Sequence, residues 1–342
     1  MNLAVVGCGA VANEHLRVLK YLDAVDAIAV CDIDEKAATR AANEWRIDRC
    51  YTDFSKMLDH EKLSIVSILT PPQYHAALAI EAIEHHVNVL VEKPLTMSTS
   101  EAESVLNSLM RNPVKLTVNY NWLMTRAMRQ AISQVNTQVI GDPLGTDIKL
   151  LHTKNDPMAS DEKHWCHRLI GGRFGELLAH PVYLLQAILG NNLNVMKVLP
   201  EKRGSLRWMP YDELYVTLRS NTGVGQIYVS FNAPRPGIFI DIYGTRRILR
   251  VDLLNQNLIS LGHRTVNKID SAMDSLTVSG KLLFSTIGNT LEYFYRERGQ
   301  NALQSTYRSL VDSILNDSEP AVTPQTAYHT VRIVEEICRG IR

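Results

Sequence analysis

Two basic side chains in the sequence could carry out proton-transfer chemistry on a hydroxyl group. Lys93 follows an apolar run, and Pro94 favours an extended backbone at Lys93, so the ammonium group should project from the end of a strand. His180 lies four residues after Glu176 in an apolar segment of helical spacing, which places both side chains on one helix face. An imidazole that titrates near neutral pH can accept a proton and return it. We therefore expect Lys93 to polarise a substrate oxygen, His180 to exchange its proton, and Glu176 to orient His180.

Each of these residues also has a simpler interpretation. A lysine before a proline is commonly a solvated residue at the start of a loop. A lone histidine on an apolar helix is commonly a core residue whose hydrogen bonds are satisfied. The carboxylate of Glu176, one helical turn away, favours the catalytic interpretation of His180. For Lys93, the choice depends on whether it lies at a ligand-binding edge of the fold.

The start of the chain predicts a nucleotide-binding turn between a first strand and a first helix. It reads MNLAVVGCGAVA, which is the pattern G-x-G-x-x-A. Gly7 permits the tight turn, Gly9 lets a diphosphate lie against the backbone, and Ala12 lets the helix pack closely on the strand. The helix N-terminus, at Ala10 and Val11, should then face the anion. On its own this pattern is weak, because glycines also occur in ordinary turns.

A second strand end supports the nucleotide site and indicates which cofactor it takes. The apolar run 27–30 ends in Cys31-Asp32, roughly 25 residues after the first glycine. A carboxylate at this position accepts hydrogen bonds from the adenosine ribose and repels a 2′-phosphate. Neither Ile33 nor Asp34 supplies an arginine for that phosphate, and Asp34 is the better helix N-cap. We therefore expect NAD(H) rather than NADP(H), with Asp32 and Ile33 at the adenosine end.

The elements that must position these residues alternate between strand and helix over residues 1–121. Such alternation predicts an α/β fold, a doubly wound parallel sheet of the Rossmann type, whose ligands bind beyond the carboxyl ends of the strands. The apolar runs 64–69 and 87–91 stop at Thr70-Pro71 and at Glu92-Lys93-Pro94. Together with Gly7 and Gly9, these stops should lie on one rim of the sheet.

Residues 122–342 follow a different pattern and predict a second domain. Apolar and polar residues alternate there, which predicts an open, largely antiparallel sheet with one solvated face and one covered face, hence an α+β domain for substrate binding and oligomerisation. The segment 175–189 has helical spacing, two further helices are predicted near the end, and the segment 267–295 is ambiguous. The predicted strands are 146–152, 194–200, 213–219, 225–231, 238–243 and 249–253, and the closing helices are 303–315 and 325–341.

Composition limits the classes of partner. The 342 residues contain 36 Lys and Arg and 36 Asp and Glu, so no net charge attracts nucleic acid or an anionic membrane. The 5 cysteines are scattered, which is typical of reduced intracellular thiols. No signal peptide and no apolar run long enough for a membrane span are recognisable. We expect a cytoplasmic protein whose partners are a small molecule and other copies of itself.

Taken together, the motifs resemble those of the Gfo/Idh/MocA family of oxidoreductases. The resemblance covers nearly the whole chain in order, and Glu-Lys-Pro at the end of the fifth strand is its most specific part. The matching segments are GCGAVA at 7–12, CDID at 31–34, TPPQYH at 70–75, VEKPL at 91–95, Gly171-Gly172, the Glu176 and His180 pair, and IDIYGT at 240–245. It implies a Rossmann domain and an α/β domain whose sheet commonly forms a subunit interface. It also implies NAD(P)-dependent oxidation or reduction of a hydroxyl on a sugar, sugar derivative or cyclitol.

The resemblance also assigns cofactor contacts. Thr70 and Pro71 should pass beside the nicotinamide, Glu92 and Lys93 should lie next to its ribose, and Asn121 should line the nicotinamide side. Trp165 matches a family tryptophan that could cover the cofactor. His75 is placed among the cofactor contacts too, although a packing or capping role is the favoured interpretation for a histidine in a first helical turn.

This sequence departs from the family pattern in two places. Where the family has D-x-G-x-H-x-x-D, the chain has Glu176, Leu178, His180 and Tyr183, so the histidine is kept and the second aspartate is replaced. After the sixth strand, the segment 120–123 lacks the arginine that the family often carries. Two alternatives therefore stay open: an oxidoreductase that keeps its nucleotide bound while it cycles two sugars, and a nonenzymatic NAD(H)-binding sensor or scaffold.

One cluster of residues could suggest a metal site. His164, Cys166 and His167 are close together, with His152 not far away in sequence. A structural zinc site needs a second pair of ligands, and no such pair is present. We expect no metal, and we expect this loop to border the substrate pocket, where a histidine or Arg168 could meet a polar or anionic group.

Overall fold

The structure is a computed structural model that describes residues 1–262, 268–295 and 302–341. The chain divides into two compact units. The first comprises residues 1–121 together with 301–332, and the second comprises 122–300 together with 333–342. The first unit is therefore assembled from two separate stretches of the chain.

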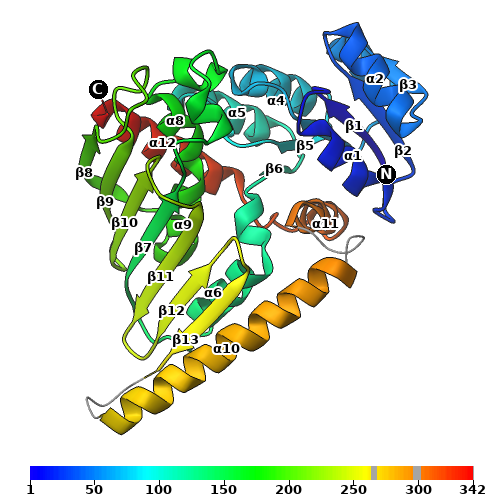
Figure 1. The fold of residues 1–342 in the computed structure, drawn as a ribbon. Helices are drawn as coiled ribbons and strands as arrows, with labels where there is room; N and C mark the ends of the chain where they lie inside the picture. Colours follow the sequence, from blue (N-terminus) through cyan, green and yellow to red (C-terminus); the bar gives the residue numbers. More distant parts are fainter. Residues whose placement is uncertain (263–267, 296–301, 342) are drawn as a thin grey trace. The chain divides into compact units, whose positions relative to one another are not determined.

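A six-stranded parallel sheet in the order β3-β2-β1-β4-β5-β6 forms the centre of the first unit (Figure 1). The strands are β1 (Asn2–Val6), β2 (Ala27–Cys31), β3 (Arg49–Tyr51), β4 (Ile65–Ile68), β5 (Asn88–Val91) and β6 (Leu116–Val118). Their apolar residues are buried, as expected when helices cover both faces of a parallel sheet. The predicted doubly wound parallel sheet is confirmed.

The strand register brings the functional segments of this unit to one edge. Val6 pairs with Cys31 on one side and with Ile68 on the other. Ile68 pairs with Val91, and Val91 pairs with Val118. Because all these strands are parallel and end level with one another, the residues that follow them emerge along a single rim of the sheet.

Helices of the first unit begin where the sequence offers capping side chains. Asp34 accepts a hydrogen bond from the backbone of Lys36, and Ser98 forms a capping box with Glu101. The helices are α1 (Ala12–Lys20), α2 (Glu35–Trp45), α3 (Phe54–His60), α4 (His75–Glu84), α5 (Thr99–Arg111), α11 (Ala302–Leu315) and the first part of α12 (Pro324–Gly340), with a short 3₁₀ turn, η1 (Pro72–Tyr74).

Helix α11 completes the core of the first unit although it comes late in the chain. Its buried residues Leu303, Tyr307 and Leu310 belong to one apolar cluster with Leu3 of β1 and Leu16 of α1. Burying such side chains stabilises the folded state by about 1.5 to 3 kcal/mol each. The N-terminal sheet and its first helix therefore depend on a segment about 290 residues further along the chain.

The second unit contains a seven-stranded mixed sheet in the order β13-β12-β11-β7-β10-β9-β8. Strands β7 and β10 pair in parallel, and the other neighbours are antiparallel, so the largely antiparallel prediction is confirmed. The strands are β7 (Pro143–Leu151), β8 (Asn194–Glu201), β9 (Glu213–Arg219), β10 (Val224–Ser230), β11 (Gly237–Gly244), β12 (Ile248–Asp252) and β13 (Asn257–Leu261). The last of these, β13, was not predicted.

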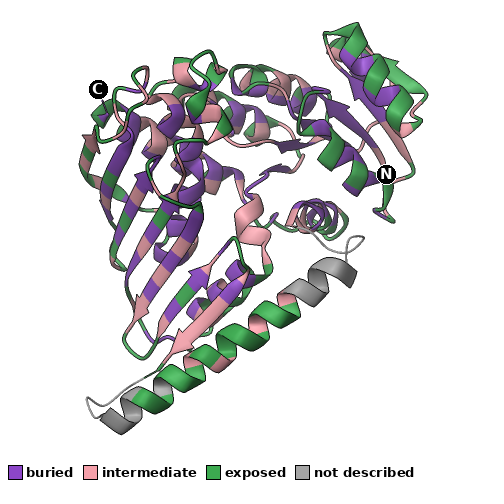
Figure 2. Ribbon diagram, viewed as in Figure 1, coloured by how far each residue is buried: buried purple, intermediate pink, exposed green. Residues whose placement is uncertain are grey.

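One face of this sheet is covered and the other is open. Helix α9 (Ala179–Leu189) is almost entirely buried and packs against β7 and β10. The strands alternate between buried and exposed residues (Figure 2), and on the open face Tyr215 stacks on Tyr228 with ring centroids 4.6 Å apart. The other helices are α6 (Arg126–Asn136), α7 (Pro157–Ser160), α8 (Gly172–Leu177) and α10 (Lys268–Tyr295), with 3₁₀ turns η2 (Asn121–Met124) and η3 (Trp165–Arg168).

The predicted helix 175–189 is two helices. Helix α8 ends at Leu177 and α9 begins at Ala179. Pro181 lies in the first turn of α9 and has no N–H, so it cannot donate to the carbonyl of residue 177, four positions earlier. The break falls between Glu176 and His180.

The ambiguous segment forms the long helix α10 from residue 268 onward, and residue 267 lies outside the described part of the chain. Much of its surface is exposed (Figure 2). The exposed apolar side chains on it are Met273, Leu276, Leu282, Leu283, Phe284 and Ile287. Among the described helices, none is both long and apolar enough to cross a membrane.

Candidate active site

The two glycines of the first turn have different structural roles. Gly7 has φ of 94°, and a Cβ there would lie 2.8 Å from the backbone nitrogen of Thr70. Only glycine fits such a conformation and such a close approach. A Cβ at Gly9, by contrast, would meet no atom of the described residues within 4 Å. The backbone at Gly9 therefore borders open space, as a phosphate-binding loop requires.

Asp32 is tied to this loop by its side chain. One carboxylate oxygen accepts the backbone N–H of Cys8 at 2.7 Å, and the other accepts the N–H of Asp34 at 2.9 Å. The capping role at α2 is taken by Asp34, as expected. Next to it, the side chain of Ile33 is 95 % exposed, which leaves an apolar surface beside the carboxylate. Val11, at the N-terminus of α1, is also exposed.

His75 joins the ends of two strands. Its ring is buried, with Nε2 2.8 Å from the carbonyl oxygen of Thr70 and Nδ1 2.7 Å from that of Pro94. Burial lowers the pKa of His75, and the two carbonyl oxygens partly oppose this effect. The peptide bond between Lys93 and Pro94 is cis. His75 therefore fixes the segment after β4 relative to the segment after β5.

Glu92 is the most heavily hydrogen-bonded carboxylate of the rim. It accepts from Nε2 of His15 at 2.9 Å, from Nδ2 of Asn119 at 2.5 Å and from the backbone N–H of Lys93 at 3.2 Å. Burial alone would raise the pKa of Glu92, but the hydrogen bonds and charges of these three neighbours hold it below its ordinary range. The carboxylate is therefore anionic, and it lies directly beside Lys93.

The contacts of Glu92 extend through a buried network to α11. His15 Nδ1 lies 2.7 Å from the hydroxyl of Tyr307, and that hydroxyl lies 2.7 Å from Oγ of Ser67. A hydroxyl of Thr306 donates to Asn119 at 3.3 Å. Because a carboxylate only accepts, His15 must donate through Nε2, so in neutral His15 the Tyr307 hydroxyl donates to Nδ1 and Ser67 donates to Tyr307. Helix α11 thus helps to hold Glu92 in place through its contacts with His15 and Asn119.

The residues of the rim fit a dinucleotide. Besides the clearance at Gly9 and the carboxylate of Asp32, the rim has two of the buried polar atoms that lack a hydrogen-bond partner among the described residues, namely Oγ1 of Thr70 and Oδ1 of Asn121. A buried polar atom without a partner costs free energy unless a ligand or water satisfies it. Both residues follow strand ends at which nicotinamide contacts are expected.

In the second unit, His180 is fixed by two aromatic residues. Its Nδ1 lies 2.8 Å from the hydroxyl of Tyr183, and its ring stacks on Trp122 with centroids 3.9 Å apart and planes inclined by 15°. The backbone N–H of Trp122 donates to the same tyrosine hydroxyl at 3.3 Å. Both His180 and Tyr183 are buried.

Glu176 belongs to an ionic cluster around the buried Arg173. It forms an ion pair with Arg173, whose guanidinium also contacts both carboxylate oxygens of Asp156 at 3.4 Å. His152 Nδ1 lies 3.0 Å from Asp156, and its Nε2 is buried without a partner in the described chain. Burial alone would raise the pKa of Asp156, but His152 and Arg173 hold it well below its ordinary range. The charge of Glu176 is thus compensated by Arg173.

The loop with the metal-capable residues uses them for its own packing. His164 Nδ1 accepts the backbone N–H of Cys166 at 3.4 Å, and His167 Nε2 lies 3.0 Å from the carbonyl oxygen of Met158. Trp165 is exposed and lies beside the ring of His164. Within the described residues, no group of three His, Cys, Asp or Glu side chains is arranged to hold a metal.

The structure thus distributes the candidate residues over both units. Those in the first unit follow the strand ends of one sheet edge: Gly7, Gly9, Ala10, Val11, Asp32, Ile33, Thr70, Pro71, His75, Glu92, Lys93 and Asn121. Those in the second unit are Trp165, Glu176 and His180. The roles of all these residues remain predictions.

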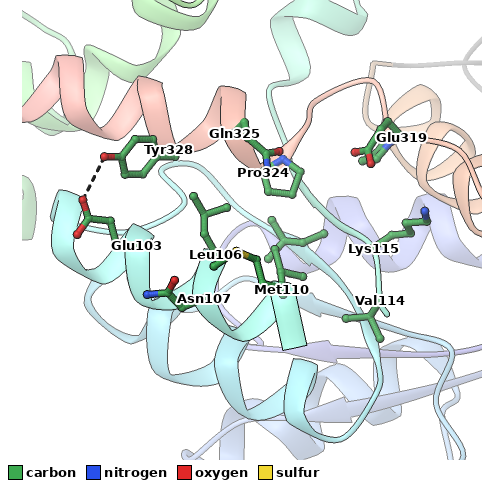
Figure 3. Close-up of a pocket in the computed structure, with 13 residues that line it drawn as sticks. Glu103, Leu106, Asn107, Met110, Val114, Lys115, Glu319, Pro324, Gln325 and Tyr328 are labelled. Atoms are coloured by element: carbon green, nitrogen blue, oxygen red, sulfur yellow. Dashed lines mark hydrogen bonds between the residues drawn. The ribbon is translucent and has the colours of Figure 1, made fainter. Parts of the chain in front are cut away.

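A cavity of about 490 Å³ in the first unit lies away from the nucleotide rim (Figure 3). It is bordered by α5 and by the start of α12, with Leu106, Met110 and Tyr328 among its lining residues. Val114 and Lys115, also in its wall, precede β6 and so mark the amino edge of the sheet. Ligands of doubly wound sheets bind at the carboxyl edge, so this cavity is not the expected cofactor site.

Several residues of the site were missed from sequence. They are His15, Asn119, Trp122, Arg173 and Tyr307. Arg173 could have been found, because it lies three residues before Glu176 and this spacing brings opposite charges together on a helix. The contacts of Tyr307 join positions 292 and 240 residues apart, and no local pattern reports such contacts.

Comparisons with known proteins agree with this architecture. Residues 1–120 match a family model described as an oxidoreductase family with an NAD-binding Rossmann fold, and residues 132–341 match the C-terminal alpha/beta domain of the same family. The D-apiose dehydrogenase of Paraburkholderia graminis is 28 % identical over 140 residues, which is 41 % of this chain and 37 % of that protein. The inositol 2-dehydrogenase of Salmonella typhimurium is 21 % identical over 234 residues, or 68 % of this chain and 67 % of that protein.

Among solved structures, the WlbA dehydrogenase from Bordetella pertussis, in complex with NADH and UDP-GlcNAcA, has a TM-score of 0.80. The two chains are 18 % identical, and the match covers 100 % of this chain and 95 % of the other. At this identity the similarity shows a shared fold.

Proposed function

Because the chain belongs to the Gfo/Idh/MocA family of oxidoreductases, with its NAD-binding Rossmann domain, we propose that it is an NAD-dependent dehydrogenase or reductase. It transfers a hydride between nicotinamide and a hydroxyl-bearing carbon of a sugar, sugar derivative or cyclitol. The observation that carries this proposal is the rim of the first unit. There the open backbone at Gly9, the carboxylate of Asp32 and the unsatisfied hydroxyl of Thr70 follow the ends of three strands.

Each rim residue has one proposed task. The turn around Gly7 and Gly9 holds the diphosphate, Asp32 accepts hydrogen bonds from the adenosine ribose, and Ile33 covers the adenine with its exposed side chain. Thr70 and Asn121 satisfy their buried oxygens on the nicotinamide side. Bound NAD supplies the hydride chemistry, which no side chain of the protein can supply itself.

The proton chemistry belongs to Lys93 and His180. Glu92 accepts the backbone N–H of Lys93 and so helps to fix the backbone of the lysine. His180 takes the hydroxyl proton during oxidation and returns it during reduction. In this proposal the charged cluster around Arg173 and the buried Nε2 of His152 contribute to binding the polar groups of the substrate.

The open face of the second sheet favours self-association. Large apolar or aromatic side chains are exposed on β8, β9 and β10: Met196, Leu199, Tyr215 and Val224. Contiguous exposed apolar surface of this kind marks interaction sites. We therefore propose a homo-oligomer with this face at the interface, and a monomeric mass in light scattering at micromolar concentration would exclude it.

The dehydrogenase proposal is tested with a substrate panel. Sugars, sugar nucleotides, sugar acids and inositols are first screened by thermal shift with NADH present, because a ligand that binds only the folded protein raises the melting temperature. The hits are then assayed with NAD⁺ at 340 nm. We expect reduction of NAD⁺ by at least one hit. Binding of NADH together with inertness toward every polyol that binds would contradict an enzymatic role.

Replacing Asp32 by serine should relax the cofactor preference. The variant loses the carboxylate that repels a 2′-phosphate. The ratio of kcat/KM for NAD⁺ to kcat/KM for NADP⁺ should therefore fall about 10- to 100-fold. Parallel titrations with both cofactors measure this ratio. The change should come mainly from KM, since the side chain does not touch the reacting carbon. An unchanged ratio would exclude Asp32 as the discriminating residue.

A further inference from the structure

Tyr183 stands where the family pattern has an aspartate, three residues after the candidate proton acceptor. Its side chain is fully buried, with 0 % of its surface exposed, and its hydroxyl lies 2.8 Å from Nδ1 of His180. The two residues lie on consecutive turns of α9 and share one face of it. A buried hydroxyl thus contacts the histidine at a position where the family has a carboxylate.

Trp122 contacts the same imidazole on the face of its ring. The hydroxyl of Tyr183 contacts Nδ1 of the ring, whereas the indole of Trp122 stacks on the face of the ring with centroids 3.9 Å apart. The backbone N–H of Trp122 also donates to the tyrosine oxygen, so the three groups form one unit. Because Nδ1 is engaged by the hydroxyl, Nε2 is the nitrogen that exchanges a proton with a substrate.

From this geometry we propose that Tyr183 is the positioning residue of His180, a neutral hydroxyl acting in place of a carboxylate. The expected effect on turnover rests on the proposed dehydrogenase function, whereas the claim that Tyr183 positions the His180 ring does not. Glu176, the residue that spacing suggests for this task, lies in α8 and forms an ion pair with Arg173, and the proposal for Tyr183 does not exclude a role for it.

The hydroxyl can follow the protonation state of the ring. A tyrosine oxygen has two lone pairs and one proton, so it can accept from Trp122 and from Nδ1–H together. In this arrangement Nε2 carries the lone pair and His180 is ready to act as a base. After Nε2 has taken the substrate proton, the bond from Nδ1–H to Tyr183 persists. When the hydroxyl accepts from Nδ1–H in this way, it holds His180 in the tautomer that the reaction needs.

A phenol differs from a carboxylate in one measurable way. A carboxylate close to an imidazole favours the charged form and raises its pKa by about 1 to 3 units, whereas a neutral phenol adds no such charge. The charged and titratable groups of the segments packed on α9 include Arg173, Glu176, Asp156 and His152, and on β7, β10 and α6 they include Asp147, Lys149, Tyr228, Arg126 and Arg129. They are unchanged in position 183 variants, so a difference between variants reports the group at position 183 itself.

The test compares Tyr183→Phe and Tyr183→Asp with the wild-type chain and with Tyr243→Phe. Tyr243→Phe is the control, because it also removes a hydrogen-bonded tyrosine hydroxyl. In the wild-type chain this hydroxyl donates to Asp147 in the second sheet. The first readout is ¹⁵N NMR of the His180 ring in the protein without cofactor or substrate, assigned by its absence in His180→Gln. The second is kcat and KM against pH with a substrate from the panel.

We expect Tyr183→Phe to shift the ¹⁵N signals of His180 toward the Nε2–H tautomer and to lower kcat about tenfold, the effect of one lost hydrogen bond, with little change in KM for NAD⁺. Tyr183→Asp should raise the pH at which His180 titrates by about 1 unit or more and move the acid limb of kcat equally. Tyr243→Phe should change neither readout.

The outcomes separate the two proposals. If the His180 signals in Tyr183→Phe match those of the wild type, Tyr183 does not position the ring, whatever the activity. If the signals move but the wild-type protein oxidises no polyol, the positioning role stands and the dehydrogenase function fails. Should Tyr183→Asp not fold, the NMR comparison of Tyr183→Phe with wild type still decides the question.

Discussion

Replacing His180 by glutamine is expected to lower kcat about 100- to 10,000-fold, the contribution of a general acid–base catalyst. Glutamine keeps the size and some of the hydrogen bonding of the ring, but it cannot exchange a proton near neutral pH. Because His180 is not among the residues proposed to hold the nucleotide, the dissociation constant for NADH should stay within about twofold. Stopped-flow or steady-state absorbance at 340 nm measures the rate, and NADH fluorescence measures binding.

The matched control is His60→Gln, since His60 is an exposed histidine at the end of α3 that only contacts a backbone carbonyl. This variant should keep the wild-type rate. If His180→Gln turned over as fast as the control, His180 would not be the proton acceptor, and the role would have to pass to another group.

Replacing Lys93 by methionine is expected to lower kcat/KM about 100- to 1,000-fold, as the loss of a preorganised donor at a reacting oxygen does in other enzymes. Methionine keeps most of the length of the stem but has no ammonium group. The loss should appear in kcat more than in KM if the ammonium acts mainly on the charge that develops in the transition state. Steady-state kinetics over a range of substrate concentrations separates the two.

Lys115→Met is the control for this variant. Lys115 also lies in the first unit, but its amine pairs with exposed Asp317 at the opposite edge of the sheet. Loss of an exposed ion pair costs little stability, so near wild-type kinetics are expected. Equal activity of Lys93→Met and Lys115→Met would remove Lys93 from the mechanism.

The first unit was largely predictable because its signals are local. Buried parallel strands are short apolar runs, and Thr70-Pro71 and Glu92-Lys93 follow two of them directly. Parallel strands that start together also end together, so the rim could be inferred without knowing any long-range contact. The roles of Gly7 and Asp34 likewise follow from backbone conformation and capping chemistry, which depend on a few neighbouring residues.

The rest depended on contacts that sequence spacing does not report. Spacing alone could not show that the helix breaks at Leu178 and that Arg173 pairs with Glu176. Nor could it show that the hydroxyl of Tyr183 contacts His180. Strand β13 was missed because its apolar alternation is short. The segment that forms α10 stayed ambiguous, and many of its apolar side chains are exposed.

The late return of α11 to the first unit has a consequence for engineering this chain. A fragment that stops near residue 121 lacks Leu303, Tyr307 and Leu310, so it leaves the apolar side of α1 uncovered and His15 without its hydroxyl partner. Such a fragment should aggregate or open rather than report cofactor affinity. Hybrids that graft the nucleotide-binding unit onto a relative must exchange two segments instead of one, because the helix at 302–315 has to be transferred together with residues 1–121.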